Sequence, residues 1–310
     1  MKKLLLVISI ISCVMFALGQ NFPFPQNVDY PYGIQASSPD NAKIQSLYTS
    51  WRNSLYEEGT GLNSSYARIK YDNQSYTVSE GVGYGLLIFV YMDNSTNSTK
   101  DEFNKLYAYY KKNGRFNGYL MNWKIDQFGS PTSDGSGSAT DGDLDVALSL
   151  VLAHKQWGST GTVNYIQEAE NLIDIIWQRQ INSGSFLVKP GDHWEDAMNP
   201  CYFTTATIKL FNEVQTAEGF TKTHAWNSVY TTAHTYLANA ESNSGLWPDW
   251  TSSSVTPSAC KPSSAGGGGC DYSWDACRTP WRIAWDYVWF GTSTAKTMLD
   301  KTVTFADTKS

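Results

Sequence analysis

Apolar residues recur along most of this chain at the three- and four-residue spacing that lines one face of an α-helix. Ile44, Leu47 and Trp51 show this spacing near its start. Such a period predicts an amphipathic helix, whereas strict alternation predicts a strand. Only 67–71 alternates, as a short hairpin would, and no pattern is typical of a large sheet. The spacing predicts about nine helices, over 41–56, 79–92, 101–112, 139–157, 163–180, 202–214, 223–240, 280–290 and 293–304.

The helix predicted over Ala139–Trp157 differs from the others because it is apolar on nearly every face. A helix of that kind lies in the protein interior. It begins with Asp141, Asp143 and Asp145. Thr140 is suited to cap its N-terminus, and Asp143 three residues later completes something close to a capping box. We therefore expect an interior helix with carboxylates at its N-terminal end.

Two other predicted helices also begin beside an acid. Glu80 starts a helix that carries glycine at 81, 83 and 85, and Asp275 stands just before the helix at 280–290. Because each glycine costs a helix roughly 1 kcal/mol relative to alanine, three so close together indicate that another segment packs tightly against that backbone. Helices of buried and amphipathic character alternate along the chain, which is typical of a barrel of inner and outer helices. In such a barrel these acids converge at one end.

The acids also have an interpretation without catalysis, because the helix macrodipole favours a carboxylate in the first turn. The residue pattern alone leaves this open for Glu80, Asp143 and Asp275. An EF-hand does not fit, because Val146 stands where it needs glycine and Leu152 where it needs glutamate. The four histidines show no metal-binding spacing, and we expect no metal and no other cofactor.

Three motifs carry a family resemblance. They are the string from Ala139 to Trp157, Ser-Glu-Gly-x-Gly-Tyr-Gly at 79–85, and Asp-Ala-x-Arg-x-Pro-Trp-Arg at 275–282. Together they closely resemble glycoside hydrolase family 8, which includes endoglucanases, xylanases and chitosanases, over about 30–301. The resemblance implies an all-α fold, an (α/α)6 barrel of six inner and six outer helices. Since the spacing predicts about nine helices, we expect this barrel to be incomplete, with C-terminal helices missing.

The resemblance also implies the catalytic roles. Glu80 matches the general acid, Asp275 the general base, and Asp141 the acid that holds the sugar in a distorted ring. Such enzymes invert the anomeric centre, so the Glu80 and Asp275 carboxyl groups are expected roughly 6.5–9.5 Å apart, with room for a water. We expect burial and Asp141 to raise the pKa of Glu80 against the helix dipole. A Glu80 that is exposed and paired with a cation would contradict the assignment.

Four further residues are candidates for substrate binding by the same resemblance. Trp123 is similar to a stacking platform, Trp274 to an aromatic beside the base, and Arg278 to an arginine that contacts the base or the sugar. Tyr202 is similar to a tyrosine near the catalytic water. Core packing is the alternative for Trp123, and a surface ion pair is the alternative for Arg278.

Composition narrows the function class. The 310 residues have a net charge of −6 and no basic stripe, so nucleic acid is not an expected partner. The 12 Trp and 19 Tyr favour carbohydrate, since aromatic rings stack on flat apolar faces. A basic start followed by an apolar run predicts a signal peptide over 1–20, a catalytic domain over 21–310, an extracellular location and no membrane association after cleavage. The four remaining cysteines allow one or two disulfides, with Cys260 and Cys270 as a candidate local pair, and the pairing is otherwise left open by the sequence.

The chain is accordingly predicted to be a secreted, monomeric endo-β-1,4-glucanase that acts on a polysaccharide. Aromatic residues near every motif favour glucan, whereas a chitosan cleft would carry extra acids. Xylanase and chitosanase activity remain open within the same family. A non-catalytic sugar-binding remnant remains open outside it.

Overall fold

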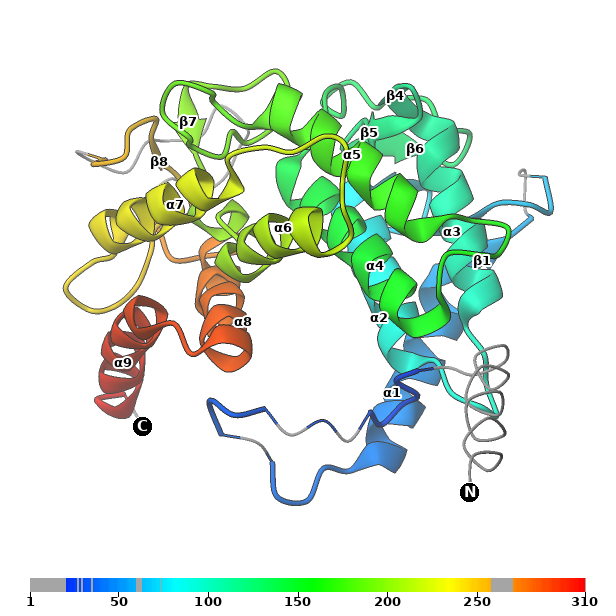
Figure 1. Cartoon of the computed structure of the whole chain (residues 1–310), viewed down its shortest axis with the longest axis horizontal. Coiled ribbons are helices and arrows are strands. Elements are labelled where there is room, and N and C mark those ends of the chain that lie inside the picture. The colour runs from blue at the N-terminus through cyan, green and yellow to red at the C-terminus, as the bar shows by residue number, and fades with distance from the viewer. Residues whose placement is uncertain are drawn as a thin grey trace, which may run out of the picture.

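The computed structural model describes residues 21–26, 28, 30–34, 36–59, 63–72, 74–257 and 270–309. The predicted signal peptide and Cys260 lie outside these residues. Within them the predicted helices are present, in a largely helical protein (Figure 1). The helices are α1 (Asn41–Leu55), α2 (Ser79–Met92), α3 (Lys100–Asn113), α4 (Thr140–Trp157), α5 (Tyr165–Gln180), α6 (Thr205–Ala217), α7 (Trp226–Ala240), α8 (Thr279–Phe290) and α9 (Ser293–Asp307).

The strands are short and pair only two by two. They are β1 (Tyr56–Glu58), β2 (Ala67–Ile69), β3 (Tyr76–Val78), β4 (Gly114–Phe116), β5 (Tyr119–Met121), β6 (Lys124–Asp126), β7 (Ala197–Met198) and β8 (Thr251–Ser252). The pairs are β1–β2, β3–β6, β4–β5 and β7–β8, all antiparallel. The strand expected from the alternation at 67–71 is present as β2, which pairs with β1, with Tyr56 opposite Ile69, and an antiparallel bridge joins Tyr71 to Tyr76 just after it.

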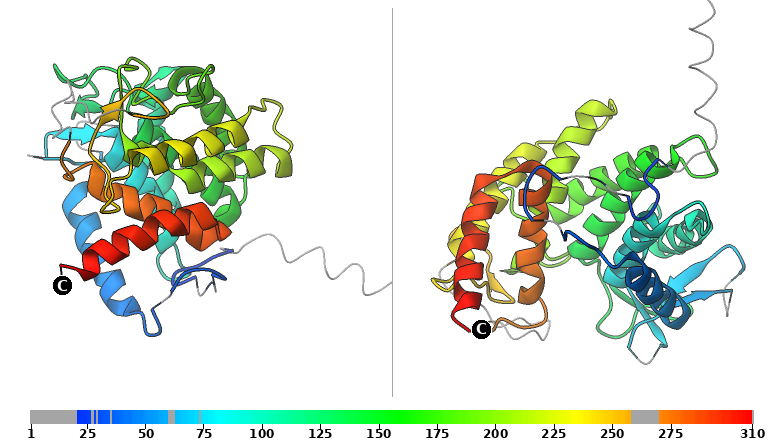
Figure 2. Two further views of the ribbon diagram at one scale, coloured as in Figure 1. Left: turned by 90° about the vertical axis from the view of Figure 1, so that its left-hand side faces the viewer. Right: turned by 90° about the horizontal axis from the view of Figure 1, so that it is seen from below.

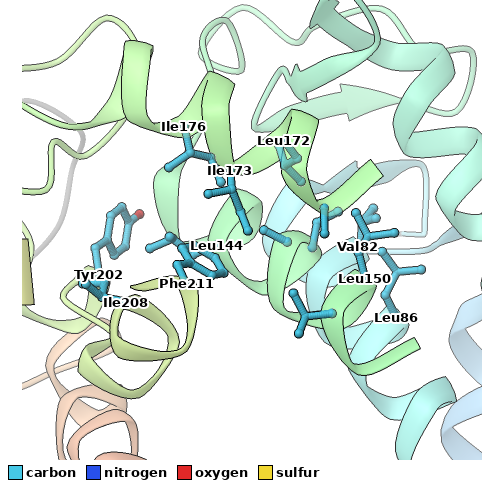
Figure 3. Close-up of a cluster of buried hydrophobic side chains, with 14 of the residues drawn as sticks. Val82, Leu86, Leu144, Leu150, Leu172, Ile173, Ile176, Tyr202, Ile208 and Phe211 are labelled. Atoms are coloured by element: carbon cyan, nitrogen blue, oxygen red, sulfur yellow. The ribbon is translucent and has the colours of Figure 1, made fainter. Parts of the chain in front are cut away.

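Helix α4 lies at the centre of the core, as its apolar pattern predicts. Every residue from Thr140 to Val151 is buried. The helix packs against α2 on one side and α5 on the other, and its start also contacts α6. Figure 3 shows the shared cluster, which includes Val82, Leu86, Leu144, Leu150, Leu172, Ile173, Ile176, Ile208 and Phe211.

The predicted cap of α4 is wrong. Its N-cap residue is Ala139, which has no capping side chain. The Thr140 hydroxyl instead donates to the carbonyl of Lys189 at 2.7 Å. A buried carbonyl without a partner is costly. The Thr140 hydroxyl therefore bonds to this distant carbonyl and does not cap the helix in the way that the local sequence predicts. Asp143 is likewise drawn to other partners, described below.

Helices α2 and α4 touch at their backbones. A Cβ added to Gly83 would lie 2.8 Å from the Cβ of Asp145 and 2.9 Å from the carbonyl oxygen of Gly142. A Cβ added to Gly142 would lie 2.7 Å from the carbonyl carbon of Ser79. The tight packing predicted from the glycines of α2 is therefore present, and it brings the starts of the two helices together.

Helices α8 and α9 pack side by side, α8 also packs against α6, and the N-terminal segment reaches α8, where the ring centres of Tyr32 and Tyr287 lie 6.2 Å apart (Figures 1 and 2). A buried ion pair joins α8 to the central helix. The two terminal nitrogens of Arg282, Nη1 and Nη2, donate to the Asp145 carboxylate at 2.5 and 2.6 Å, and both side chains are at most 1% exposed. Such a two-point contact fixes geometry as well as distance, so α8 is held in register with α4.

The α2–α4 contact predicts a sharp difference between two neighbouring glycines. Gly83→Ala should lower the free energy of unfolding by about 1–3 kcal/mol, because the added methyl overpacks a backbone contact. Gly81→Ala is the matched control, since its Cβ would meet side chains only at 3.5 and 3.7 Å and alanine favours the helix by up to about 1 kcal/mol. Urea unfolding of both variants measures this, and equal stabilities would contradict it.

Candidate active site

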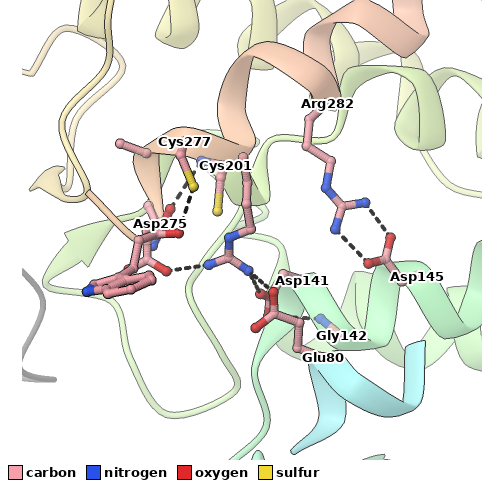
Figure 4. Close-up of polar contacts among 12 residues, drawn as sticks. Glu80, Asp141, Gly142, Asp145, Cys201, Asp275, Cys277 and Arg282 are labelled. Carbon is pink, nitrogen blue, oxygen red and sulfur yellow. Dashed lines mark hydrogen bonds and ion pairs between the residues drawn. The ribbon is translucent and has the colours of Figure 1, made fainter. Parts of the chain in front are cut away.

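The structure brings three predicted acids to one place (Figure 4). Glu80 is in the first turn of α2, and Asp141 is in the first turn of α4. Asp275 immediately precedes a 3-10 turn over Ala276–Arg278, called η3 here, that leads into α8. The contact between α2 and α4 accounts for the first two, and the start of α8 supplies the third.

The guanidinium of Arg278 contacts all three carboxylates. Its Nη1 donates to Glu80 and, at 2.8 Å, to Asp141, while its Nη2 donates to Asp275. The Arg278 side chain is only 13% exposed, so this is not the surface ion pair considered from the sequence. One cation therefore compensates carboxylates that come from three separate segments of the chain.

Burial and neighbouring charge perturb the pKa of both catalytic candidates. Burial raises the pKa of Glu80 above its ordinary value, the charge of Asp141 raises it further, and Arg278 opposes this. The predicted direction is confirmed. Glu80 does pair with a cation, but its side chain is only 33% exposed and the raised pKa stands despite that pairing. Burial also raises the pKa of Asp275, where Arg278 is the largest opposing influence.

The other two acids of α4 have different partners. Asp145 binds Arg282, as described above. Asp143 is fully buried and accepts hydrogen bonds from the Tyr110 hydroxyl at 2.6 Å and the Gln180 amide at 2.7 Å. Burial raises the pKa of Asp143 to about 8. Since neither of these two acids meets Arg278, Asp141 is the α4 acid that belongs to the site.

The four predicted substrate-binding residues surround this cluster to different degrees. Trp274 adjoins Asp275 and is 89% exposed. The backbone of Trp123 accepts a hydrogen bond from Ser79 at 2.9 Å, next to Glu80, and its indole nitrogen donates to the Asp134 carbonyl at 2.8 Å. Tyr202 is buried, and its ring centre lies 6.0 Å from the guanidinium carbon of Arg278. Trp274, Tyr202 and Arg278 thus lie at the cluster itself, whereas Trp123 is joined through its backbone to the residue before Glu80.

Sequence reasoning missed two groups that hold the site together. One is the Asp145–Arg282 pair, which the spacing of Arg278 and Arg282 by one helical turn could have indicated. The other is Asp249, whose carboxylate accepts hydrogen bonds from the loop that carries Asp275. No local pattern marks Asp249, which lies between tryptophans 247 and 250, both buried.

The described residues include histidines, cysteines and many acids. They contain no group of three or more His, Cys, Asp or Glu side chains arranged to hold a metal ion. In the same part of the chain, no helix combines the length and apolarity that crossing a bilayer requires. Cys201 and Cys277 carry free thiols. The predicted Cys260–Cys270 disulfide involves a residue outside the described part and stays a prediction.

Comparison with known proteins gives consistent matches. The family described as Glycosyl hydrolases family 8 matches residues 39–309. The chain is 37% identical over 302 residues to Endoglucanase 2 of Ruminiclostridium josui, which covers 94% of this chain and 61% of that protein. Identity to Endoglucanase C of Ruminiclostridium cellulolyticum is 37% over 305 residues, with 94% and 62% covered. The chain therefore spans about three fifths of the length of these relatives.

A solved structure agrees with the sequence matches. The β-1,3-1,4-glucanase from Paenibacillus sp. X4 superposes with a TM-score of 0.83 at 31% identity, covering 94% of this chain and 79% of that one. The fold class predicted from the sequence, a helical barrel with inner and outer helices, is confirmed by this match and by the family assignment.

Removal of Arg278 should destabilise the protein in a pH-dependent way. Arg278→Ala leaves three carboxylates without their cation, and we expect a loss of about 2–3 kcal/mol near pH 7, below the full cost of a buried pair because Glu80 is partly exposed. The loss should shrink as pH falls toward 4, because Glu80 and Asp275, whose pKa values are raised by burial, then become protonated and the repulsion falls. Denaturant unfolding between pH 4 and 8 measures this.

The matched control for Arg278 is Lys296→Ala, which removes an exposed pair with Asp300 on α9. Such pairs contribute about 0.5 kcal/mol or less. A loss in Arg278→Ala that is as small as in this control, or that does not depend on pH, would contradict the role given to Arg278.

Asp143 should make stability fall as pH rises. The folded protein keeps this proton up to about pH 8, whereas the unfolded chain releases it near its ordinary pKa, so the stabilisation is complete below about pH 4 and is lost as pH rises through 8. Asp143→Asn cannot titrate. Between pH 4 and 8 its free energy of unfolding should therefore fall less than that of the wild type, by about 4–5 kcal/mol.

Unfolding curves at several pH values test the Asp143 prediction. Asp300→Asn, an exposed carboxylate on α9, is the control and should leave the slope nearly unchanged. If Asp143→Asn and the wild type show the same dependence on pH, the buried carboxyl is not the group that titrates.

Proposed function

This chain belongs to glycosyl hydrolase family 8, and from that membership we propose that it is a secreted, endo-acting hydrolase of β-1,4-linked glucan. The observation that carries the proposal is the convergence of Glu80, Asp141 and Asp275 on one guanidinium. Hydrolysis of a glycosidic bond by this class of enzyme needs two carboxyl groups that flank the bond. The three acids come from segments far apart in sequence, and the fold gathers them at one end of α2, α4 and α8.

The charges around the two acids favour one assignment of roles. At Glu80 the largest charge effect comes from Asp141 and raises the pKa, which suits a group that must hold a proton. At Asp275 the largest charge effect comes from Arg278 and lowers the pKa, which suits a group that must accept one. Burial raises the pKa of both acids and Arg278 opposes the rise at both, so the two differ in which charge has the larger effect, Asp141 at Glu80 and Arg278 at Asp275.

The mechanism that we propose follows from these roles. Glu80 protonates the oxygen of the leaving sugar, and Asp275 takes a proton from a water that attacks the anomeric carbon from the opposite face. The product then has inverted configuration. Asp141, held by Arg278, is placed to bind the sugar at the cleavage point in its distorted ring shape. The Glu80 and Asp275 carboxyl groups are expected roughly 6.5–9.5 Å apart when substrate and water are bound.

Aromatic side chains support a polysaccharide substrate. Trp274 exposes most of its indole next to Asp275, and an exposed ring of this size presents a flat apolar surface on which a sugar can stack. Trp123 adjoins the start of α2 near Glu80. We propose that these two tryptophans bind sugar units close to the cleaved bond, with Tyr202 and Arg278 beneath them.

The choice of glucan rests on the relatives. Those at 37% identity are named endoglucanases, and a β-1,3-1,4-glucanase has the same fold at 31% identity. Mixed-linkage glucan is therefore the second candidate substrate. Xylan and chitosan remain alternatives within the family, as does sugar binding without turnover. Export, a monomeric state and the Cys260–Cys270 disulfide are proposed from the sequence alone.

A substrate panel with two variants tests the proposal. The protein is incubated with carboxymethylcellulose, mixed-linkage β-1,3-1,4-glucan, xylan and chitosan, beside Glu80→Gln and Asp275→Asn. We expect reducing sugar from the first two substrates, and at least a 100-fold loss in each variant, as removal of a general acid or base entails. Proton NMR of the first product should show the α-anomer.

Three outcomes would overturn parts of this proposal. Equal release by the wild type and Glu80→Gln would remove the catalytic assignment. Release from xylan or chitosan alone would show that the substrate is that polysaccharide and not β-1,4-linked glucan. Binding of cello-oligosaccharide without release from any substrate would favour the sugar-binding alternative.

A further inference from the structure

Asp275 lies on a loop that has little packing of its own. Its neighbours Tyr272 and Trp274 are exposed, and Cys277 on the following turn is exposed as well. A general base must keep its position to within a fraction of an ångström, because a misplacement of about 1 Å can cost a factor of 100 in rate. Asp275 bonds to Arg278 and Ala276 is buried, but the exposed side chains of the loop do not fix its backbone, so a further anchor is needed.

We propose that Asp249 is this anchor, a positioning residue whose carboxylate fixes the backbone that carries the general base Asp275. The role of Asp275 as a general base rests on the proposed function, whereas the anchoring of its loop does not. Asp249 is 1% exposed, so its side chain is not accessible to a substrate. It acts on the reaction only through Asp275.

The contacts of Asp249 are unusually concentrated on one turn. Its Oδ1 accepts hydrogen bonds from the backbone nitrogens of Ser273 at 3.2 Å, Asp275 at 3.1 Å and Ala276 at 2.7 Å. Its Oδ2 accepts from the Ser273 hydroxyl. The backbone nitrogen of Asp249 in turn donates to the carbonyl of Asp271 at 2.9 Å. One buried carboxylate thus caps η3 and binds the residues on both sides of Trp274.

Asp249 is itself held by rigid neighbours. Trp247 is buried and its indole nitrogen donates to the carbonyl of Leu237 on α7 at 2.9 Å. Trp250 is buried against Tyr202, with ring centres 6.2 Å apart. Thr251, two residues after Asp249, begins β8 and pairs with Met198 of β7. Asp249 is therefore fixed relative to α7 and β7, and its hydrogen bonds hold the loop that carries Asp275 in the same position.

The charge of Asp249 has a second consequence for the base. The charged groups that face Asp275 are Arg278 on η3, Asp141 on α4 and Asp249 on the loop before β8, with Glu80 on α2 bound to the same guanidinium. Arg278 lowers the pKa of Asp275, whereas Asp141 and Asp249 raise it. Loss of the Asp249 charge should therefore lower the pKa of the base, even where the geometry of the loop is preserved.

Two substitutions separate the geometric part from the electrostatic part. Asp249→Asn can keep an oxygen in the place of Oδ1, so all three backbone hydrogen bonds survive while the charge is lost. Asp249→Ala removes both. Ser273→Ala is the control, because it deletes only the hydroxyl that donates to Oδ2 and leaves the Asp249 charge unchanged.

The first measurement is hydrogen–deuterium exchange of the backbone amides over 270–278, which does not depend on activity. In Asp249→Ala, exchange of these amides should speed up by about 10-fold or more, because bonds from backbone amides to a charged acceptor are lost. In Asp249→Asn and Ser273→Ala it should stay close to the wild type. Unchanged exchange in Asp249→Ala would overturn the anchoring.

The second measurement is the pH dependence of hydrolysis on the best substrate. Asp249→Ala should lower kcat by about 100-fold with little change in KM. Asp249→Asn should keep kcat within a few-fold and move the acidic limb of kcat/KM to lower pH, while Ser273→Ala leaves that limb in place. Full kcat in Asp249→Ala, or identical acidic limbs in Asp249→Asn and Ser273→Ala, would overturn the positioning role. A wild type without activity would overturn the proposed function, and the exchange data would still decide the anchoring.

Discussion

The site depends on one electrostatic arrangement, the guanidinium of Arg278 among three carboxylates. Carboxylates gathered this closely repel one another, and burial makes the repulsion stronger because little water screens it. A single planar cation with several N–H donors can satisfy acids that approach it from different directions. Arg278 therefore does more than bind Asp275, since it makes the meeting of α2, α4 and η3 electrostatically tolerable while leaving the acid and the base with different surroundings.

A second arginine, one helical turn further along α8, stabilises the frame on which this arrangement rests. Arg282 binds Asp145 in the buried core, while Arg278 binds Asp141 at the helix mouth. Of these two acids of α4, Asp145 is thus engaged in packing through Arg282, and Asp141 lies in the candidate site through Arg278. Buried ion pairs contribute little net stability, but their geometry specifies how elements pack. Here the Asp145–Arg282 pair determines the rotation of α8 and with it the direction in which Arg278 extends.

Most of the helical fold could be predicted because its cause is local. The three- and four-residue spacing reflects which side chains face the core, and every helix predicted from it is present among the described residues. The assignment of Thr140 as a cap failed because a distant carbonyl, that of Lys189, competes for its hydroxyl. Asp249 was missed for a related reason. Its partners are backbone amides more than twenty residues away. Every residue except proline has such an amide, so the sequence does not indicate which one is bound.

The contact between Gly83 and Gly142 has a consequence for motion. No side chain separates the two helix backbones at this point. A change of side-chain rotamer therefore cannot let the first turns of α2 and α4 slide past each other. Glu80 and Asp141 therefore move as parts of one stiff body. Asp275 lies instead on a loop that is held by the carboxylate and backbone of Asp249 and by Arg278. Thermal fluctuation in the distance between acid and base should then arise chiefly on the side of the base, and the width of the gap that admits water is controlled there.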